Sequence, residues 1–91
     1  MTALRARLPD GRWHLQHGPI DVVIGADGDS RAVDAAHEAA WRRFETILAE
    51  LVAELPALRR PVRDGACPLE GVVARRMWHA CYPYHDRHVT P

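Results

Sequence analysis

The sequence of 91 residues contains no lysine, only two cysteines and a single phenylalanine, and its acidic and basic residues balance at 12 each. Because the net charge is zero, the chain lacks the broad positive field that draws proteins to nucleic acids or anionic membranes. The two cysteines, Cys67 and Cys81, are too few for a disulfide framework. We therefore expect free thiols, a cytoplasmic location and no nucleic-acid partner.

The sequence also lacks long apolar runs. No stretch approaches the roughly 20 residues needed to cross a bilayer, and residues 1–7 lack the apolar run of a signal peptide. With 47% hydrophobic and 26% charged residues, the composition is that of a globular domain. We expect residues 1–91 to form one small domain with a thin core and no contact with a membrane.

The first 26 residues predict an antiparallel meander. Apolar and polar residues alternate in three short segments, which are separated by the turn sequences Pro9-Asp10-Gly11 and Gly18-Pro19. Alternation of this kind places the apolar residues of each strand on one face. These residues are Leu4, Ala6 and Leu8, then Trp13 and Leu15, and then Ile20, Val22 and Ile24.

A long helix is predicted over residues 31–55, with Pro56 as its stop signal. At 100° per residue, the apolar side chains of this segment fall within about 60° of Phe44. We expect this stripe to cover the sheet, and His37, which lies on it, to be a hydrogen-bonded core histidine. The stripe comprises Val33, His37, Ala40, Phe44, Ile47, Leu48, Leu51 and Leu55, of which Phe44, Leu48 and Leu51 are expected against Trp13, Leu15, Val22 and Ile24.

A second, shorter helix is predicted after an irregular connector over residues 57–68. Pro68 suits its first turn, and Leu69, Val73, Met77 and Ala80 line up on one side of it. Trp78 lies about 140° from Val73 and is expected to face outward. The predicted fold is therefore an α+β meander of about three strands, covered by a long helix and followed by a shorter one, in an incomplete domain.

The C-terminal residues hold four potential metal ligands, and the connector holds a cysteine. Zinc sites usually join two separate pairs of ligands, whereas this segment provides a single cluster, so we expect no metal and an irregular tail. Cys67 near the start of the second helix would have a lowered thiol pKa, but no histidine lies nearby in sequence to act as a base. We assign no catalytic residue, so whether the protein is an enzyme stays open. The four potential ligands are His79, Cys81, His85 and His88.

Residues 59–76 form a basic segment with five arginines against Asp64 and Glu70. Guanidinium groups bind phosphate through two parallel hydrogen bonds, so this segment is a candidate for an anion site. A solvated surface loop is the alternative. The five are Arg59, Arg60, Arg63, Arg75 and Arg76.

Three blocks, residues 13–26, 43–56 and 73–77, resemble the N-terminal part of the uncharacterised ApbE-like family, which is related to flavin transferases. The resemblance implies a larger domain of which residues 1–91 are the N-terminal part, and FAD or FMN as cofactor. The metal-binding and nucleotide-binding motifs of true flavin transferases have no matching positions here. The resemblance implies a ligand-facing role for Arg75, Arg76 and Thr90, whereas His88 stands where the family pattern has an aromatic residue.

Two functional hypotheses follow. The first is an ApbE-like protein that binds a flavin or another phosphate-bearing small molecule and is inactive as this fragment. The second is a non-enzymatic interaction module, which forms a homo-oligomer or binds another protein through the face that carries Trp78.

Overall fold

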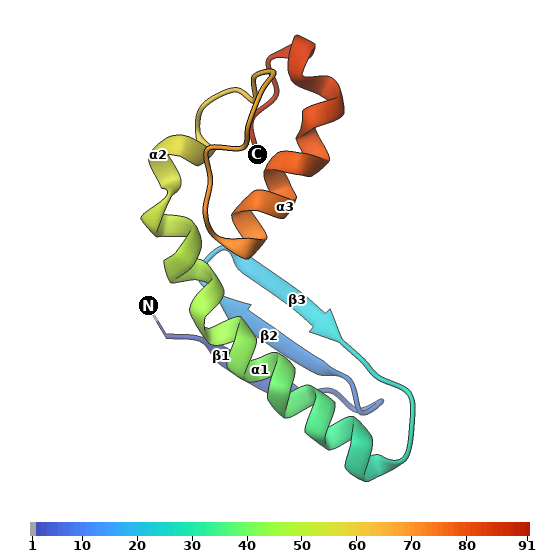
Figure 1. Cartoon of the computed structure of the whole chain (residues 1–91). Helices are drawn as coiled ribbons and strands as arrows, with labels where there is room; N and C mark the ends of the chain where they lie inside the picture. The colour runs from blue at the N-terminus through green and yellow to red at the C-terminus, as the bar shows by residue number, and fades with distance from the viewer. Residues whose placement is uncertain (1) are drawn as a thin grey trace. The chain divides into compact units, whose positions relative to one another are not determined.

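The structure, a computed structural model, describes residues 2–91 and divides into two compact units, Met1–Leu48 (unit 1) and Ala49–Pro91 (unit 2) (Figure 1). Each unit has its own cluster of buried side chains. No helix within residues 2–91 is long and apolar enough to cross a membrane. The elements are β1 (Leu4–Arg7), β2 (Trp13–His17), β3 (Ile20–Ile24), α1 (Ser30–Ala53), α2 (Leu55–Leu58), α3 (Val72–Cys81) and the 3₁₀ helix η1 (Tyr82–Arg87).

The predicted α+β fold is confirmed. The three strands form one antiparallel sheet in the order β1-β2-β3, with β2 in the centre. The turn between β2 and β3 places Gly18 at a φ of 56°, which glycine adopts without strain. Helix α1 follows the sheet and crosses one of its faces (Figure 1).

The core of unit 1 joins this helix to the central strand. Trp13 and Leu15 from β2 are buried together with Phe44 from α1, which confirms the predicted pairing of these three side chains. Two parts of that prediction are wrong: Val22 stays 38% exposed, and Leu51 contacts the buried cluster of unit 2 instead.

Lengths and strand order explain both differences. Helix α1 has 24 residues and is therefore about 36 Å long, whereas a strand of five residues spans about 17 Å. Its apolar stripe is longer than the sheet and supplies side chains to two clusters. Val22 lies on β3, an edge strand, while the buried aromatic residues contact central β2.

His37 is buried as predicted, with 2% of its surface exposed, and its ring lies 5.2 Å from that of Trp13. The expected hydrogen bonds are absent, because neither ring nitrogen has a partner within residues 2–91. At the rim of the same core, Arg5 stacks over the rings of Trp13 and Trp41 and forms an ion pair with Glu38 at 3.0 Å.

The connector between α1 and α3 begins with a helical turn that the sequence does not predict. Helix α1 ends at Ala53, and Pro56 lies in the first turn of α2. Proline lacks an N–H group, and the first turn of a helix leaves that group without a helical partner in any case. Pro56 thus marks the start of a new helix rather than only the end of the previous one.

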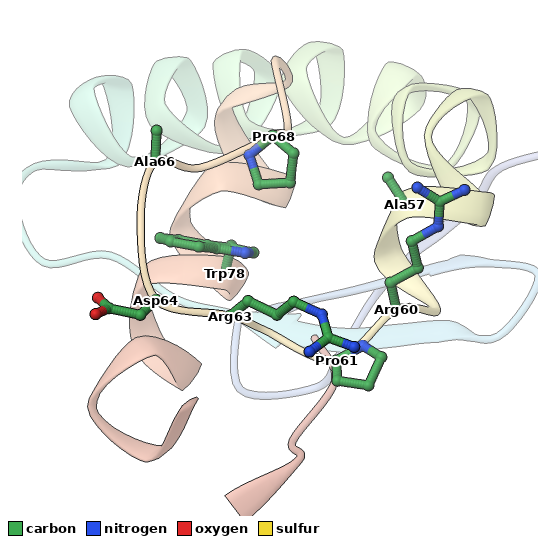
Figure 2. A pocket seen from close by; sticks show the side chains of 8 residues that line it. All are labelled: Ala57, Arg60, Pro61, Arg63, Asp64, Ala66, Pro68 and Trp78. Carbon is green, nitrogen blue, oxygen red and sulfur yellow. The ribbon is translucent and has the colours of Figure 1, made fainter. Parts of the chain in front are cut away.

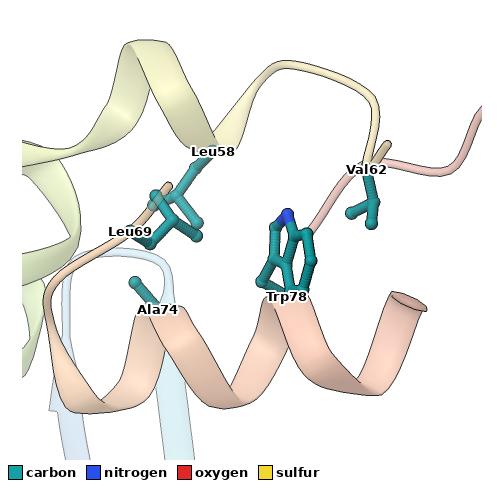
Figure 3. Close-up of a cluster of buried hydrophobic side chains, with 5 residues drawn as sticks. All are labelled: Leu58, Val62, Leu69, Ala74 and Trp78. Carbon is teal, nitrogen blue, oxygen red and sulfur yellow. The ribbon is translucent and has the colours of Figure 1, made fainter. Parts of the chain in front are cut away.

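The core of unit 2 corrects the orientation expected for α3. Trp78 is only 4% exposed, so the prediction that it faces outward is wrong (Figure 3). Helix α3 begins at Val72, so Leu69 precedes it and does not define its buried face. That face is set by Ala74 and Trp78, four residues apart, against which the connector folds. The buried cluster comprises Leu58, Val62, Leu69, Ala74 and Trp78.

The C-terminal residues are more regular than predicted. They form η1, after which His88 adopts a left-handed conformation with a φ of 57°. The chain then returns to the connector, where the carbonyl of Val89 accepts a hydrogen bond of 2.7 Å from the N–H group of Val62. This bond ties the tail to the loop that covers Trp78.

Candidate anion-binding cavity

Unit 2 contains a cavity of about 260 Å³ between the connector and α3 (Figure 2). The indole of Trp78 lies among its lining side chains, and two prolines and two alanines add apolar surface. Two arginines and one aspartate supply the charged groups. The complete lining is Ala57, Arg60, Pro61, Arg63, Asp64, Ala66, Pro68 and Trp78.

The two arginines carry the positive charge of this cavity. The guanidinium of Arg60 lies beside Ala57 and that of Arg63 beside Pro61, whereas the carboxylate of Asp64 points away from both (Figure 2). Both arginines are exposed, and within residues 2–91 neither guanidinium has an ion pair or a side-chain hydrogen bond. Both groups are therefore available to an anion.

Asp64 is held by a residue outside the cavity lining. The hydroxyl of Tyr82 donates a hydrogen bond to one oxygen of the Asp64 carboxylate. This bond lowers the pKa of Asp64 from its ordinary value, with a smaller contribution from His85, and raises the pKa of Tyr82. Asp64 therefore stays ionised, with one oxygen engaged by Tyr82 rather than by an arginine.

The loop that carries the arginines is fixed at both ends by buried apolar side chains. Val62 lies between the two arginines and Leu69 follows the loop, and each is only 1% exposed. Between them Gly65 has a φ of 123°, a conformation that other residues rarely adopt. Arg60 lies two positions before the buried Val62 and Arg63 directly after it, and both exposed arginines border one cavity.

None of the three residues predicted to face a ligand lines this cavity. Arg75 is exposed on α3 and donates a hydrogen bond of 3.1 Å to the carbonyl of Leu69. Arg76 is also exposed on α3, and the carbonyl of Thr90 accepts a long contact of 3.8 Å from the Cys81 thiol. A ligand-facing role for Arg75, Arg76 and Thr90 stays a prediction.

The basic segment of the sequence did contain Arg60 and Arg63, but periodicity gave no means of choosing them over the other arginines. The cavity was missed because Trp78 was predicted to face outward, whereas its indole lies beside the connector and lines the cavity. No signal in the sequence marks Val62, the valine between Pro61 and Arg63, as the buried residue of this loop.

The cysteines and histidines do not form a second site. Within residues 2–91 no group of three or more histidine, cysteine, aspartate or glutamate residues is placed to hold a metal ion. Cys67 lies five residues before Val72, the first residue of α3, and is therefore farther from the start of this helix than expected. Cys67 and Cys81 are both free.

The fold and the cavity together define a small α+β protein with an arginine-bordered pocket in its C-terminal half. A family model described as AbpE bacteria matches residues 5–91, so the chain belongs to this family. No curated protein and no solved structure matches the chain.

This match corrects the resemblance drawn from the three sequence blocks. The matching family carries a different name, and nothing in the comparison indicates an ApbE-like flavin transferase. The expectations of a flavin cofactor and of a larger ApbE-like domain rest on that resemblance and lose their basis with it. The basic segment and its arginines do not depend on it.

Proposed function

We propose that the protein binds a small phosphate-bearing molecule in the cavity over Trp78. The observation that carries this proposal is that Arg60 and Arg63 border one cavity and have no anionic partner within residues 2–91. Guanidinium groups present a planar set of donors that matches phosphate oxygens. The aromatic and proline side chains of the lining suit a short organic group attached to the phosphate.

The volume limits the ligand. Pockets that enclose a drug-sized molecule measure roughly 300–1,000 Å³. At about 260 Å³, this cavity suits a phosphate monoester with a small organic group better than a whole dinucleotide. A cytoplasmic location is part of the proposal, since free Cys67 and Cys81 are typical of a reducing compartment.

Phenyl phosphate and inorganic phosphate are suitable probes, with phenol as the uncharged comparison. We expect calorimetry to detect binding of phenyl phosphate, weaker binding of phosphate and no binding of phenol. The double variant Arg60→Gln and Arg63→Gln removes both guanidinium groups and should reduce phenyl phosphate affinity at least about tenfold, which corresponds to one lost charged hydrogen bond.

The single variants Arg60→Gln and Arg63→Gln should each weaken this binding in part. Arg76→Gln is their matched control, because it removes one guanidinium charge, as each of them does, but from an exposed position outside the cavity. It should bind phenyl phosphate like the parent protein. Equal losses in the control and in each single variant would mean that only net charge attracts the anion. A larger loss in Arg76→Gln would favour the residues Arg75, Arg76 and Thr90 and contradict the cavity.

The second hypothesis, a non-enzymatic interaction module, requires an interaction surface other than the face that carries Trp78. Trp78 is buried and therefore offers no face to another chain. A separate observation, the edge strand β3 of unit 1 with its partly exposed Val22 and Val23, favours self-association.

A further inference from the structure

The two edges of the sheet in unit 1 differ in how they are protected. An edge strand exposes unpaired backbone N–H and C=O groups, and natural sheets commonly guard such edges with charged side chains that point toward the covered face. On β1, Arg5 and Arg7 are such residues, because they lie opposite Leu15 and Trp13 of β2. Arg5 is held there by its ion pair with Glu38.

The opposite edge, β3, has no such guard. Its sequence Ile20-Asp21-Val22-Val23-Ile24 contains no proline and a single charge. That charge, on Asp21, lies on the other face of the sheet and contacts the imidazole Nε2 of His14 at 2.6 Å. The covered face of this strand carries only apolar side chains.

Val22 is the clearest sign that this edge is incomplete. It lies directly opposite Leu15, so both side chains project from the face that α1 covers. Leu15 is only 1% exposed, whereas Val22 remains 38% exposed and its neighbour Val23 49% exposed. A further strand beside β3 would cover Val22 and pair its free backbone edge.

We propose that β3 pairs in antiparallel fashion with β3 of a second copy of this chain, joining two three-stranded sheets into one of six strands. The sequence is self-complementary when the two-fold axis passes beside Val22. Ile20 then lies opposite Ile24 of the second copy, and Val22 lies opposite its own counterpart. Each Asp21 lies opposite Val23 of the second copy, which keeps the two carboxylates from facing one another.

This register also keeps the covered faces of the two sheets on one side. A shift by one residue would place the apolar residues of one copy beside the opposite face of the other. A shift that centred the axis on Asp21 would set two like charges directly opposite each other. The two-fold arrangement is closed, so it leads to a dimer and not to a fibre.

The pairing of two five-residue strands covers less surface than the roughly 1,600 Å² of a standard stable interface, so the dimer should be reversible. Sedimentation equilibrium over a wide concentration series measures this directly. We expect the mass of the parent protein to rise from that of a monomer toward twice that value. A parent protein that stays monomeric throughout the series would overturn the proposal.

Two lysine substitutions at neighbouring positions test the register. Val22→Lys sets two positive charges directly opposite each other and should abolish the dimer. Val23→Lys adds the same charge opposite Asp21 of the second copy, so it should dimerise at least as strongly as the parent protein. Circular dichroism establishes that each variant is folded.

Val23→Lys decides the register even where Val22→Lys proves unstable, because Val23 is about half exposed and its replacement leaves the core intact. Loss of the dimer in Val23→Lys with retention in Val22→Lys would place the axis beside Val23 and contradict the proposed pairing. Equal loss in both variants would also contradict it. Phosphate binding is measured on the other unit, so failure of either proposal leaves the other to be judged by its own experiment.

Discussion

One carboxylate oxygen of Glu54 lies 2.9 Å from the backbone nitrogen of Gly71, the residue that caps the N-terminus of α3. The other oxygen accepts a hydrogen bond of 2.7 Å from the N–H group of Glu70. A side chain 17 positions earlier in the sequence thus satisfies two N–H groups next to the start of this helix. The negative charge also suits the positive end of the helix dipole.

The first prediction concerns the pH dependence of this contact. The two N–H groups lower the pKa of Glu54 below its ordinary value. The contact therefore stabilises the fold fully above the pKa of the unfolded chain, near pH 4, and this contribution is lost as the pH falls through the lower folded value. Glu54→Gln should lower the melting temperature at pH 7, and the gap to the parent protein should narrow toward pH 3.

Gly71→Ala provides the matching test of geometry. A methyl group at this position would lie 2.9 Å from the nearer Glu54 oxygen, although the backbone angles of Gly71 suit any residue. The substitution should therefore destabilise the parent protein more than it destabilises the Glu54→Ala variant, in which the colliding carboxylate is gone. Equal effects in the two backgrounds, measured by thermal unfolding, would mean that the contact between Glu54 and Gly71 contributes nothing.

The parts of the fold that the sequence predicts are those set by nearby residues. The three strands follow from alternation over a few positions, and the burial of Phe44 follows from its helical stripe. The orientation of Trp78 does not follow from periodicity, because it depends on the connector folding back over α3. That fold is fixed by contacts between distant residues, such as the bond between Val62 and Val89.

The candidate cavity likewise depends partly on nearby residues, which the sequence reveals, and partly on distant contacts, which it does not. The arginine-rich segment is evident from composition, yet the choice of Arg60 and Arg63 requires knowing how the connector folds over Trp78. Val62 lies between Pro61 and Arg63 in a segment without apolar periodicity, so the sequence does not show that it packs in the same cluster as Trp78. The anion site could therefore be narrowed to a segment, but not to its residues, before the fold was known.

The second prediction compares two positions of the long helix. Phe44 is buried in the cluster of unit 1, so Phe44→Ala should reduce the free energy of unfolding by about 3–5 kcal/mol. Leu48 is only half-buried, so Leu48→Ala should reduce it by less, on the order of 1 kcal/mol. Urea unfolding monitored by tryptophan fluorescence measures both. A larger effect at Leu48 than at Phe44 would contradict the burial described for this helix.

The third prediction concerns Trp78, which should be shielded from water in the monomer. A variant with Trp13→Phe and Trp41→Phe retains Trp78 as its only tryptophan, and its emission should be blue-shifted. Because the indole is already covered by side chains of its own unit, dilution should not change this emission. Emission that shifts to the red on dilution would show that a second chain, rather than the connector, covers the indole.

The last prediction addresses the cost of burying His37. Its two ring nitrogens have no hydrogen-bond partner within residues 2–91, and its ring contacts that of Trp13. A buried polar group without a partner costs about 1–3 kcal/mol, whereas an apolar side chain of similar size has no such cost. His37→Leu should therefore raise the free energy of unfolding by about 1 kcal/mol, while His37→Gln, which keeps polar atoms in the same place, should not raise it. Urea unfolding at neutral pH distinguishes the two variants. A His37→Leu variant less stable than the parent protein would contradict this prediction. The imidazole would then stabilise the fold by more than its lost hydration costs, and its ring contact with Trp13 would be the interaction responsible.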